Sequence, residues 1–212
     1  MARAFSEIAF TPSVRAEQER LGSARMYDRF LLPEAEGANR FTDVEAAFIA
    51  ARDGFFQATV SETGWPYVQF RGGPAGFVKA LDETTLAYAD FRGNRQYVSL
   101  GNLRKDTRVS LIMVDYPNRR RIKIMGHART VEIADNPELV DQLMVLGYKA
   151  KPERAVLIDL EGFDWNCPAH IPERFTLEEL RTHLGPVQQE LARLTAENEA
   201  LKAALDGRDE PR

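Results

Sequence analysis

The sequence predicts a mainly β protein, a small β-barrel or meander with helices at its periphery, and three observations support this fold class. Between residues 55 and 160, short aliphatic, β-branched and aromatic runs alternate with turn residues such as glycine, proline and asparagine. A hydrophobic content of 44% is enough for a sizeable core in a chain of 212 residues. Helical patterns precede and follow this segment. We therefore expect one β domain with helical appendages.

The N-terminal residues are expected to be helical. A Thr-Pro-Ser sequence at residues 11–13 is a helix-start signal with Ser13 as the N-cap, and Gly22 divides the pattern over residues 13–29 into two helices. The sequence Thr-Asp-Val-Glu at residues 42–45 starts another helix, over residues 43–52. Its apolar residues recur at helical spacing, so we expect it to cover one end of the barrel and to carry no chemistry.

Strand patterns follow at regular intervals. In the first, Phe56, Ala58 and Val60 alternate with polar residues, which is the period of a half-buried strand. A helix is expected at residues 136–146, before the last strand. The expected strands cover residues 55–62, 67–70, 77–81, 86–89, 109–116, 121–131 and 155–160.

One more helix is expected to interrupt these strands, over residues 95–106. The sequence Phe-Arg-Gly-Asn-Arg at residues 91–95 precedes it, and Asn94 is expected to be its N-cap. A Gly-Asn turn that opens a helix beside two arginines suits a phosphate, because the free N–H groups of the first turn and the helix dipole favour an anion.

Composition excludes several classes of protein. A net charge of −4 and an isoelectric point near 5.5 give no general attraction to nucleic acid or to an anionic membrane. A single cysteine excludes an internal disulfide and a cysteine-rich zinc site, and no metal site is expected. No signal peptide or membrane-length apolar run is present, so a cytoplasmic protein is expected.

The order of several motifs resembles a known family. The motifs are RGGPxGFVK, then a strand, then GNRQ opening a helix, then RVSLI, then RIKIxGxA. In this order they resemble the FMN-binding split barrel of the pyridoxamine 5′-phosphate oxidase family, over residues 47–175. The resemblance implies a six-stranded split β-barrel at residues 42–176, between a helical segment at 1–41 and a C-terminal helix at 177–212. It also implies a homodimer with flavin mononucleotide (FMN) at each subunit boundary.

The resemblance assigns cofactor-binding positions. In the family, main-chain atoms of a glycine-rich segment run along the flavin and a lysine closes the segment; a Ser-Arg-Lys run holds the phosphate; and a Trp and an Arg-Phe pair come from the second subunit. The positions of this chain that match are Pro74, Ala75, Gly76, Phe77, Val78, Lys79, Tyr88, Asn94, Arg95, Gln96, Arg121, Trp165 and Arg174.

Some matching positions differ in chemistry. Asn94 replaces the family serine and can still cap a helix, whereas Gln96 replaces a lysine and removes one charge. Arg95 is therefore expected to carry more of the phosphate binding. Arg121 matches a family glutamine that touches the flavin; it could stabilise the reduced, anionic ring or contact the phosphate instead.

The chain departs from the family's named enzyme near its C-terminal motif. True pyridoxamine phosphate oxidases have Arg-Leu-His-Asp-Arg before the phenylalanine, and their Arg and His hold the substrate. This chain has His-Ile-Pro-Glu-Arg at residues 170–174, so the substrate arginine is missing and His170 is two residues early. B-vitamer oxidase activity is therefore not expected. Cys167 near His170 has no orienting partner in the sequence and is weak evidence for a nucleophile.

The C-terminal tail carries a heptad pattern. Leu194 and Leu201 occupy d positions, and an Asn at one a position is the usual specifier of a parallel two-stranded coil. The alternative is a single amphipathic helix on the domain surface. No basic region precedes the pattern, so DNA reading by a leucine zipper is not expected. The seam residues are Val187, Leu191, Leu194, Asn198, Leu201 and Leu205.

Three functions remain open from the sequence. The first is an FMN flavoprotein that acts as an oxidoreductase on a small molecule. The second is a non-catalytic flavin or haem carrier or sensor on the same barrel. The third is a dimerisation module with a vestigial site, which the loss of charge at Gln96 favours. Fold alone does not choose among them.

Overall fold

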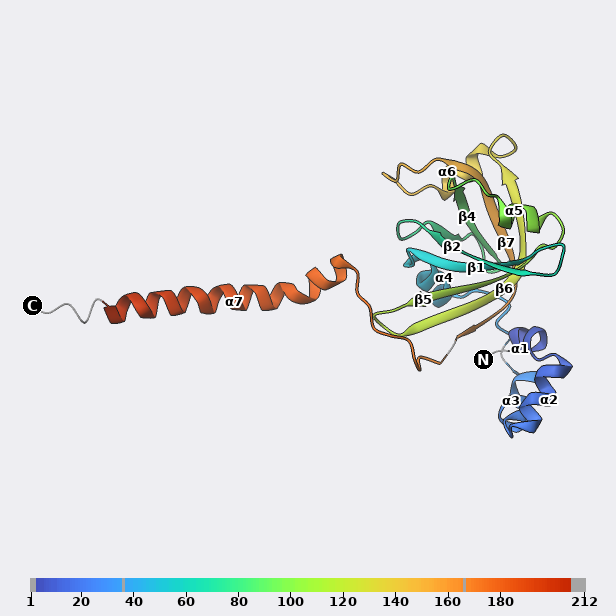
Figure 1. The fold of residues 1–212 in the computed structure, drawn as a ribbon, viewed down its shortest axis with the longest axis horizontal. Helices are drawn as coiled ribbons and strands as arrows, with labels where there is room; N and C mark the ends of the chain where they lie inside the picture. The colour runs from blue at the N-terminus through green and yellow to red at the C-terminus, as the bar shows by residue number, and fades with distance from the viewer. Residues whose placement is uncertain (1–2, 36, 166, 207–212) are drawn as a thin grey trace, which may run out of the picture. The chain divides into compact units, whose positions relative to one another are not determined.

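The computed structural model describes residues 3–35, 37–165 and 167–206, and its centre is a single antiparallel sheet of seven strands in the order β2-β1-β5-β6-β7-β4-β3 (Figure 1). The mainly β fold class is confirmed. All seven strand segments expected from the sequence form strands, which is one more than the six of the split barrel that the resemblance implied, and the edge strand β3 is only three residues long. The strands are β1 Gly54–Val60, β2 Pro66–Gly72, β3 Val78–Ala80, β4 Thr85–Phe91, β5 Arg108–Asp115, β6 Arg120–Glu132 and β7 Pro152–Trp165.

The two longest strands join the two halves of the sheet. The first half of β6 pairs with β5, and the first half of β7 pairs with β4, while β6 and β7 pair along their whole length. The register shifts between Met125 and Gly126. A Cβ on Gly126 would lie 2.3 Å from the main-chain oxygen of Asp159, so only glycine fits at this shift.

The core lies inside the curved sheet. Its fully buried side chains are aromatic and aliphatic and include Phe55, Phe77, Leu111 and Ile124. Phe55 stacks on Phe77 with ring centroids 5.9 Å apart. Phe55, Leu111 and Ile124 come from alternate positions of β1, β5 and β6, and Phe77 lies just before β3. The two-residue period of β1 is as predicted, but its buried positions are Phe55, Gln57 and Thr59, so the apolar alternation of Phe56, Ala58 and Val60 marks the outer face of the strand.

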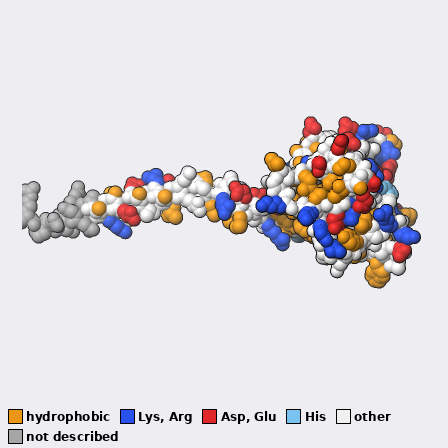
Figure 2. All heavy atoms as spheres, turned by 90° about the horizontal axis from the view of Figure 1, so that it is seen from above, with side chains coloured by type: hydrophobic (Ala, Val, Ile, Leu, Met, Phe, Trp, Pro, Cys, Tyr) orange, Lys and Arg blue, Asp and Glu red, His pale blue; other side chains and the backbone are white. Residues whose placement is uncertain are grey.

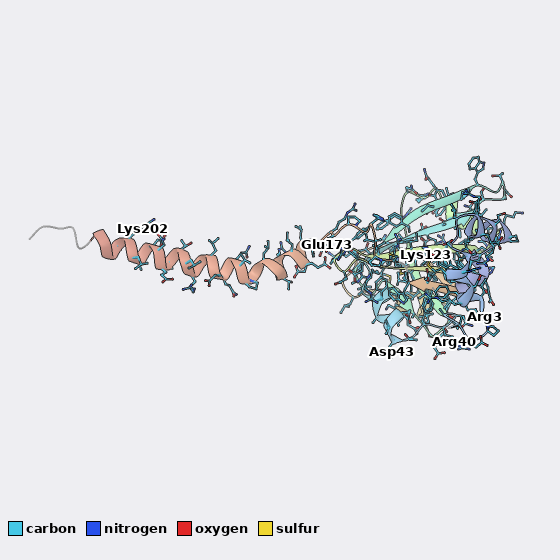
Figure 3. All side chains as sticks on the ribbon, turned by 90° about the horizontal axis from the view of Figure 1, so that it is seen from below. Arg3, Arg40, Asp43, Lys123, Glu173 and Lys202 are labelled. Atoms are coloured by element: carbon cyan, nitrogen blue, oxygen red, sulfur yellow. The ribbon has the colours of Figure 1, made fainter. Side chains whose placement is uncertain are left out.

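Helix α4 (Asp43–Ala50) packs beside β3 and starts as predicted. Thr42 is its N-cap, and Glu45 completes a capping box with it. Asp43 lies at the outer surface at this helix start (Figure 3). Helix α6 (Pro137–Leu143) is three residues shorter at its C-terminus than expected, because Met144 leaves the helical conformation with ψ at 147°.

The N-terminal segment contains more helices than expected. They are α1 Arg3–Ala9, α2 Pro12–Arg20, α3 Ala24–Asp28 and the short 3₁₀ helix η1 Arg29–Leu31. The break at Gly22 is confirmed, with its φ at 76°. The prediction of Ser13 as N-cap is wrong: Thr11 caps α2, and Pro12 takes the first helical position, where its missing N–H costs nothing. Helix α1 was not predicted.

The chain forms two compact units, residues 1–115 with 119–171 and residues 116–118 with 172–212. The second contains α7 (Leu177–Asp206), a helix of 30 residues that includes Pro186. Thr176 and Glu179 form a capping box at its start. Arg193 pairs with Glu190 and Glu197 along its surface. No helix among the described residues is long and apolar enough to cross a membrane.

Candidate functional site

A cleft opens at one end of the barrel between strand ends, the loop over residues 92–97 and helix α5 (Val98–Leu103). Polar and charged side chains dominate its wall, which suits a charged ligand better than an apolar one. No cluster of His, Cys, Asp and Glu suited to a metal ion occurs among the described residues. The cleft is lined chiefly by Gln69 and Arg71 from β2, Asp90 from β4, Arg95 from the loop, Ser99 from α5 and Glu153 from β7.

An ion-pair network fixes the floor of this cleft. Arg71 Nη1 donates to Asp90 Oδ1 at 2.6 Å, and Arg154 Nη1 donates to Asp90 Oδ2 at 2.9 Å. Burial opposes the charge of Arg154, but hydrogen bonding and attraction to Asp90 and Glu132 outweigh it and raise the pKa of its guanidinium. Arg71 Nε is buried and has no hydrogen-bond partner among the described residues, so it is left as a donor.

The loop beside the network contradicts one prediction. Helix α5 begins at Val98 with Tyr97 as its N-cap, not at Arg95 with Asn94 as N-cap. Arg95 and Tyr97 have φ of 63° and 54°, a left-handed conformation that a right-handed helix cannot contain. Asn94 instead accepts a hydrogen bond from the Gln96 N–H at 3.2 Å, which closes a local turn.

Arg95 is therefore presented on a turn instead of at a helix start. Its side chain is exposed, and it makes no hydrogen bond or ion pair with any described residue. A six-residue helix also contributes little dipole, so the guanidinium itself must supply any attraction for an anion. The predicted role of Asn94 as a cap is lost, while Asn94 and Arg95 both remain at the cleft.

Three other predicted positions point into the core. The hydroxyl of Tyr88 donates to Gln57 Oε1 at 2.8 Å, and burial raises the pKa of this phenol far above its ordinary value. Phe77 and Val78 are each 1% exposed, so only their main chain could meet a ligand. The side chains of these residues hold the fold together and do not line the cleft.

The glycines at residues 73 and 76, just before β3, are required by the local structure. A Cβ on Gly73 would come within 2.6 Å of the Phe77 ring, and Gly76 has a φ of 86°. Packing and turn geometry therefore require glycine here without a cofactor. Lys79 Nζ donates to the Gln142 carbonyl at the end of α6, at 2.6 Å. Pro74 and Ala75 lie in the same surface turn, away from the cleft lining.

Arg121 and Trp165 lie at the opposite ends of β6 and β7 from the cleft. Trp165 pairs with Ile122, whereas Arg154, which borders the cleft, pairs with Glu132. Trp165 Nε1 donates to Glu45 Oε1 at 2.8 Å, which locks the indole onto the start of α4. One subunit therefore does not bring these two positions to Arg95.

Arg174 belongs to the second compact unit. Its guanidinium lies 5.0 Å from the ring centroid of Tyr116, a cation–π contact within that unit. The residues that build the cleft floor were not predicted from the sequence. A charged residue next to an apolar strand pattern could have indicated them: Asp90 follows one apolar run and Arg154 precedes another.

One face of the sheet is apolar and exposed. Phe56 on β1 lies opposite Phe70 on β2 and Ile112 on β5, and their exposed fractions are 43%, 58% and 38%. Val68 extends this apolar sheet face, and the register places Arg121 beside it, opposite Val114. Figure 2 shows that hydrophobic side chains gather in patches on the barrel surface. Contiguous exposed apolar areas are typical of interaction surfaces.

A protein-family model identifies the fold. The family model described as pyridoxamine 5′-phosphate oxidase matches residues 41–160, more than half of the chain, and confirms the split barrel. No curated protein matches the chain.

Solved structures resemble the chain more distantly. HupZ from Group A Streptococcus is 16% identical over 58% of this chain and 91% of its own, with a TM-score of 0.47. An FMN-binding protein from Syntrophomonas wolfei is 12% identical over 72% and 97%, with a TM-score of 0.45. An oxidase-like protein from Lactobacillus delbrueckii is 17% identical over 59% and 94%, with a TM-score of 0.45. These scores support no conclusion about function.

Proposed function

Because the chain belongs to the pyridoxamine 5′-phosphate oxidase family, we propose that it is a flavoprotein that binds FMN and acts as an oxidoreductase on a small molecule. The observation that carries the proposal is a pair of guanidinium groups lining one cleft, Arg71 and Arg95, of which Arg95 has no hydrogen-bond or ion-pair partner among the described residues. Forked, charge-assisted donors of this kind suit a phosphate dianion.

The charges around the cleft fit this ligand. The carboxylates of Asp90 and Glu132 are paired with Arg154, and Glu153 lies 3.8 Å from the guanidinium of Arg92. Tyr97 donates a further hydrogen bond to Glu153 at 3.2 Å. Two arginines (residues 71 and 95) and two carboxylates (residues 90 and 153) line the cleft. Arg154 and Arg92 pair with these carboxylates from beside it, so the charge of Arg95 is not offset by a direct partner among the described residues.

The homodimer is part of the proposal. The apolar sheet face around Phe56 and Phe70 would be covered by a second copy of the chain. Arg121 lies beside this face, so pairing would bring it to a subunit boundary. The distance between Trp165 and the cleft along β7 supports a site in which Trp165 and Arg174 come from the second subunit.

The chain's own groups would position the cofactor and exclude water. FMN, when bound, would supply the two-electron chemistry of its ring. Tyr88 stays protonated and hydrogen-bonded to Gln57, so it does not act as a general base. The lining carboxylates Asp90 and Glu153 are both ion-paired, which leaves neither as a free base at the cleft.

This lack of a free acid–base group favours one alternative function, a non-catalytic flavin or haem carrier or sensor on the same barrel. Turnover separates the two: an oxidoreductase would oxidise NADH or NADPH or consume oxygen in the presence of FMN, whereas a carrier would bind its ligand without turnover. Titration with haem, followed by its Soret absorption, tests the haem form of the alternative directly.

The proposal that Arg95 binds the FMN phosphate is tested by removing first the phosphate and then the arginine. FMN and riboflavin, which lacks the phosphate, are titrated into the wild-type protein, Arg95→Ala and the control Arg104→Ala. Arg104 is an exposed arginine at the C-terminal end of α5, outside the cleft lining. We expect Arg95→Ala to weaken FMN about tenfold or more and to leave riboflavin unchanged. Equal FMN affinity in all three proteins would refute the assignment.

A further inference from the structure

The helix α7 carries an apolar stripe with the spacing of a coiled-coil seam. Val187, Leu191, Leu194 and Leu201 follow one another at intervals of four, three and seven residues, and Asn198 occupies the a position between the last two. The four apolar side chains are between 47% and 64% exposed. Figure 2 shows hydrophobic side chains recurring along the helix. The side chain of Leu205, at the next a position, lies outside the described residues.

We propose that residues 187–205 of α7 pair with the same residues of a second copy of the chain in a parallel, in-register, two-stranded coiled coil. The helix already has the necessary form, because it continues through Pro186 and remains helical to Asp206. Pro186 falls at a c position, outside the seam, so its ring does not enter the interface.

The seam residues select two strands. Leu194 and Leu201 are at d, where leucine favours a two-stranded coil. Asn198 at a is costly to bury alone, but two copies in register can hydrogen-bond to each other across the interface. Any shifted register would place Asn198 against a leucine, so this residue fixes the alignment of the two helices.

The flanking charges select the parallel direction. Glu190 and Glu197 are at g positions and Lys202 is at e, on the C-terminal half of α7 (Figure 3). In a parallel pair each Glu197 faces the Lys202 of the other helix, five residues further along. In an antiparallel pair g positions face g positions, which would set glutamates against glutamates. Arg193, at the outward c position, already pairs with both glutamates and orients them.

A second copy is a better occupant than the chain's own barrel. A helix that packs on a globular surface buries a stripe of at least three positions per two turns, wider than an a/d seam. Here the positions beside the seam are Gln188, Thr195 and Lys202 on one side and Glu190 and Glu197 on the other. Such polar flanks fit a narrow helix–helix contact. The pairing does not require flavin, so a failed FMN titration would leave it standing.

Disulfide trapping in the full-length protein tests the proposal. Cys167 is the only cysteine, so Cys167→Ser gives a background without thiols. Into it are placed Val187→Cys at d, Asn198→Cys at a and the control Ala196→Cys at the outward f position. Disulfides form only when the two Cα atoms approach within about 7 Å, which a parallel in-register pair allows at a and d but not at f.

Both seam variants are expected to cross-link in a glutathione redox buffer at least ten times faster than Ala196→Cys. Cross-linking at 198 without 187 would indicate antiparallel pairing and overturn the proposal. Equal rates at all three positions would overturn it too. If α7 instead packs on the barrel of its own chain, no variant should give a cross-linked dimer, and this outcome would also overturn the proposal. Circular dichroism confirms that each variant keeps the helix.

Discussion

Glu45 connects the start of α4 to the end of β7, and its removal gives a prediction that can be worked out from the contacts. One carboxylate oxygen accepts the Thr42 N–H at 3.0 Å, and the other accepts Trp165 Nε1 at 2.8 Å. Glu45 is only 5% exposed, and the indole it holds also packs edge-on against Phe48 at 4.7 Å.

The Glu45→Ala substitution removes both acceptors. Loss of a capping interaction costs about 0.5–2 kcal/mol, and leaving the half-buried Trp165 Nε1 without an acceptor costs about 1–2 kcal/mol. Together these give a loss of about 2–4 kcal/mol in the free energy of unfolding. Glu45→Gln keeps one neutral acceptor, so about 1–2 kcal/mol is expected. Urea denaturation followed by circular dichroism measures both.

The pH dependence gives a second signature of the same contact. Burial opposes ionisation of Glu45, but the hydrogen bonds from Thr42 and Trp165 outweigh it and lower the pKa of the carboxyl. Its stabilisation is therefore complete above the ordinary pKa of about 4.3 and is lost as the pH falls through the lower folded-state value. The difference between wild type and Glu45→Gln should shrink in acid.

Glu138→Gln is the matched control. Glu138 is also a glutamate in the first turn of a helix, α6, but it is exposed and makes no hydrogen bond or ion pair with the residues that the structure describes. It should change stability by less than about 0.5 kcal/mol. If Glu45→Ala and Glu138→Gln unfold at the same urea concentration, or if the Glu45→Gln difference persists unchanged at low pH, the reasoning is refuted.

Three further predictions concern the barrel. Tyr88→Phe leaves Gln57 buried without its donor and should cost about 1–3 kcal/mol in urea denaturation; no loss would show that the bond is unimportant. Gly126→Ala should destabilise by about 1–3 kcal/mol through overlap with the main chain of β7, whereas Gly101→Ala, in open space within α5, should be neutral or stabilising. Phe70→Asp on the apolar sheet face should weaken the proposed dimer, so its sedimentation coefficient should fall on dilution before that of the wild type; identical behaviour would contradict an interface at this face.

The sequence carried most of the fold because its strands are marked by local patterns. The two-residue period around Phe56 and the helix start at Thr42 depend on neighbouring residues alone, and both appear in the structure. Which face of β1 is buried depends on the rest of the sheet, and it is the face of Phe55 and Gln57, not that of Phe56. Helix α1 could not be predicted, because what holds it is its contact with distant β7, where the main chain of Phe5 lies within 2.8 Å of a Cβ placed on Gly162.

The candidate site was harder to predict for the same reason. Arg95 was found because it belongs to an ordered motif, but its left-handed backbone cannot be read from the sequence. The ion pairs of Asp90 with Arg71 and Arg154 join residues 19 and 64 positions apart, so only the sheet order brings them together. Tyr88 was predicted to contact the flavin, but its side chain faces the core, which the sequence alone does not show.

The most direct test of flavin binding is the visible absorption spectrum of the purified protein before and after FMN is added. We expect a yellow protein, or a colourless one that binds added FMN to saturation, with the flavin absorption bands shifted and resolved relative to those of free FMN. A colourless protein whose mixture with FMN has only the spectrum of the free flavin would contradict the proposed cofactor.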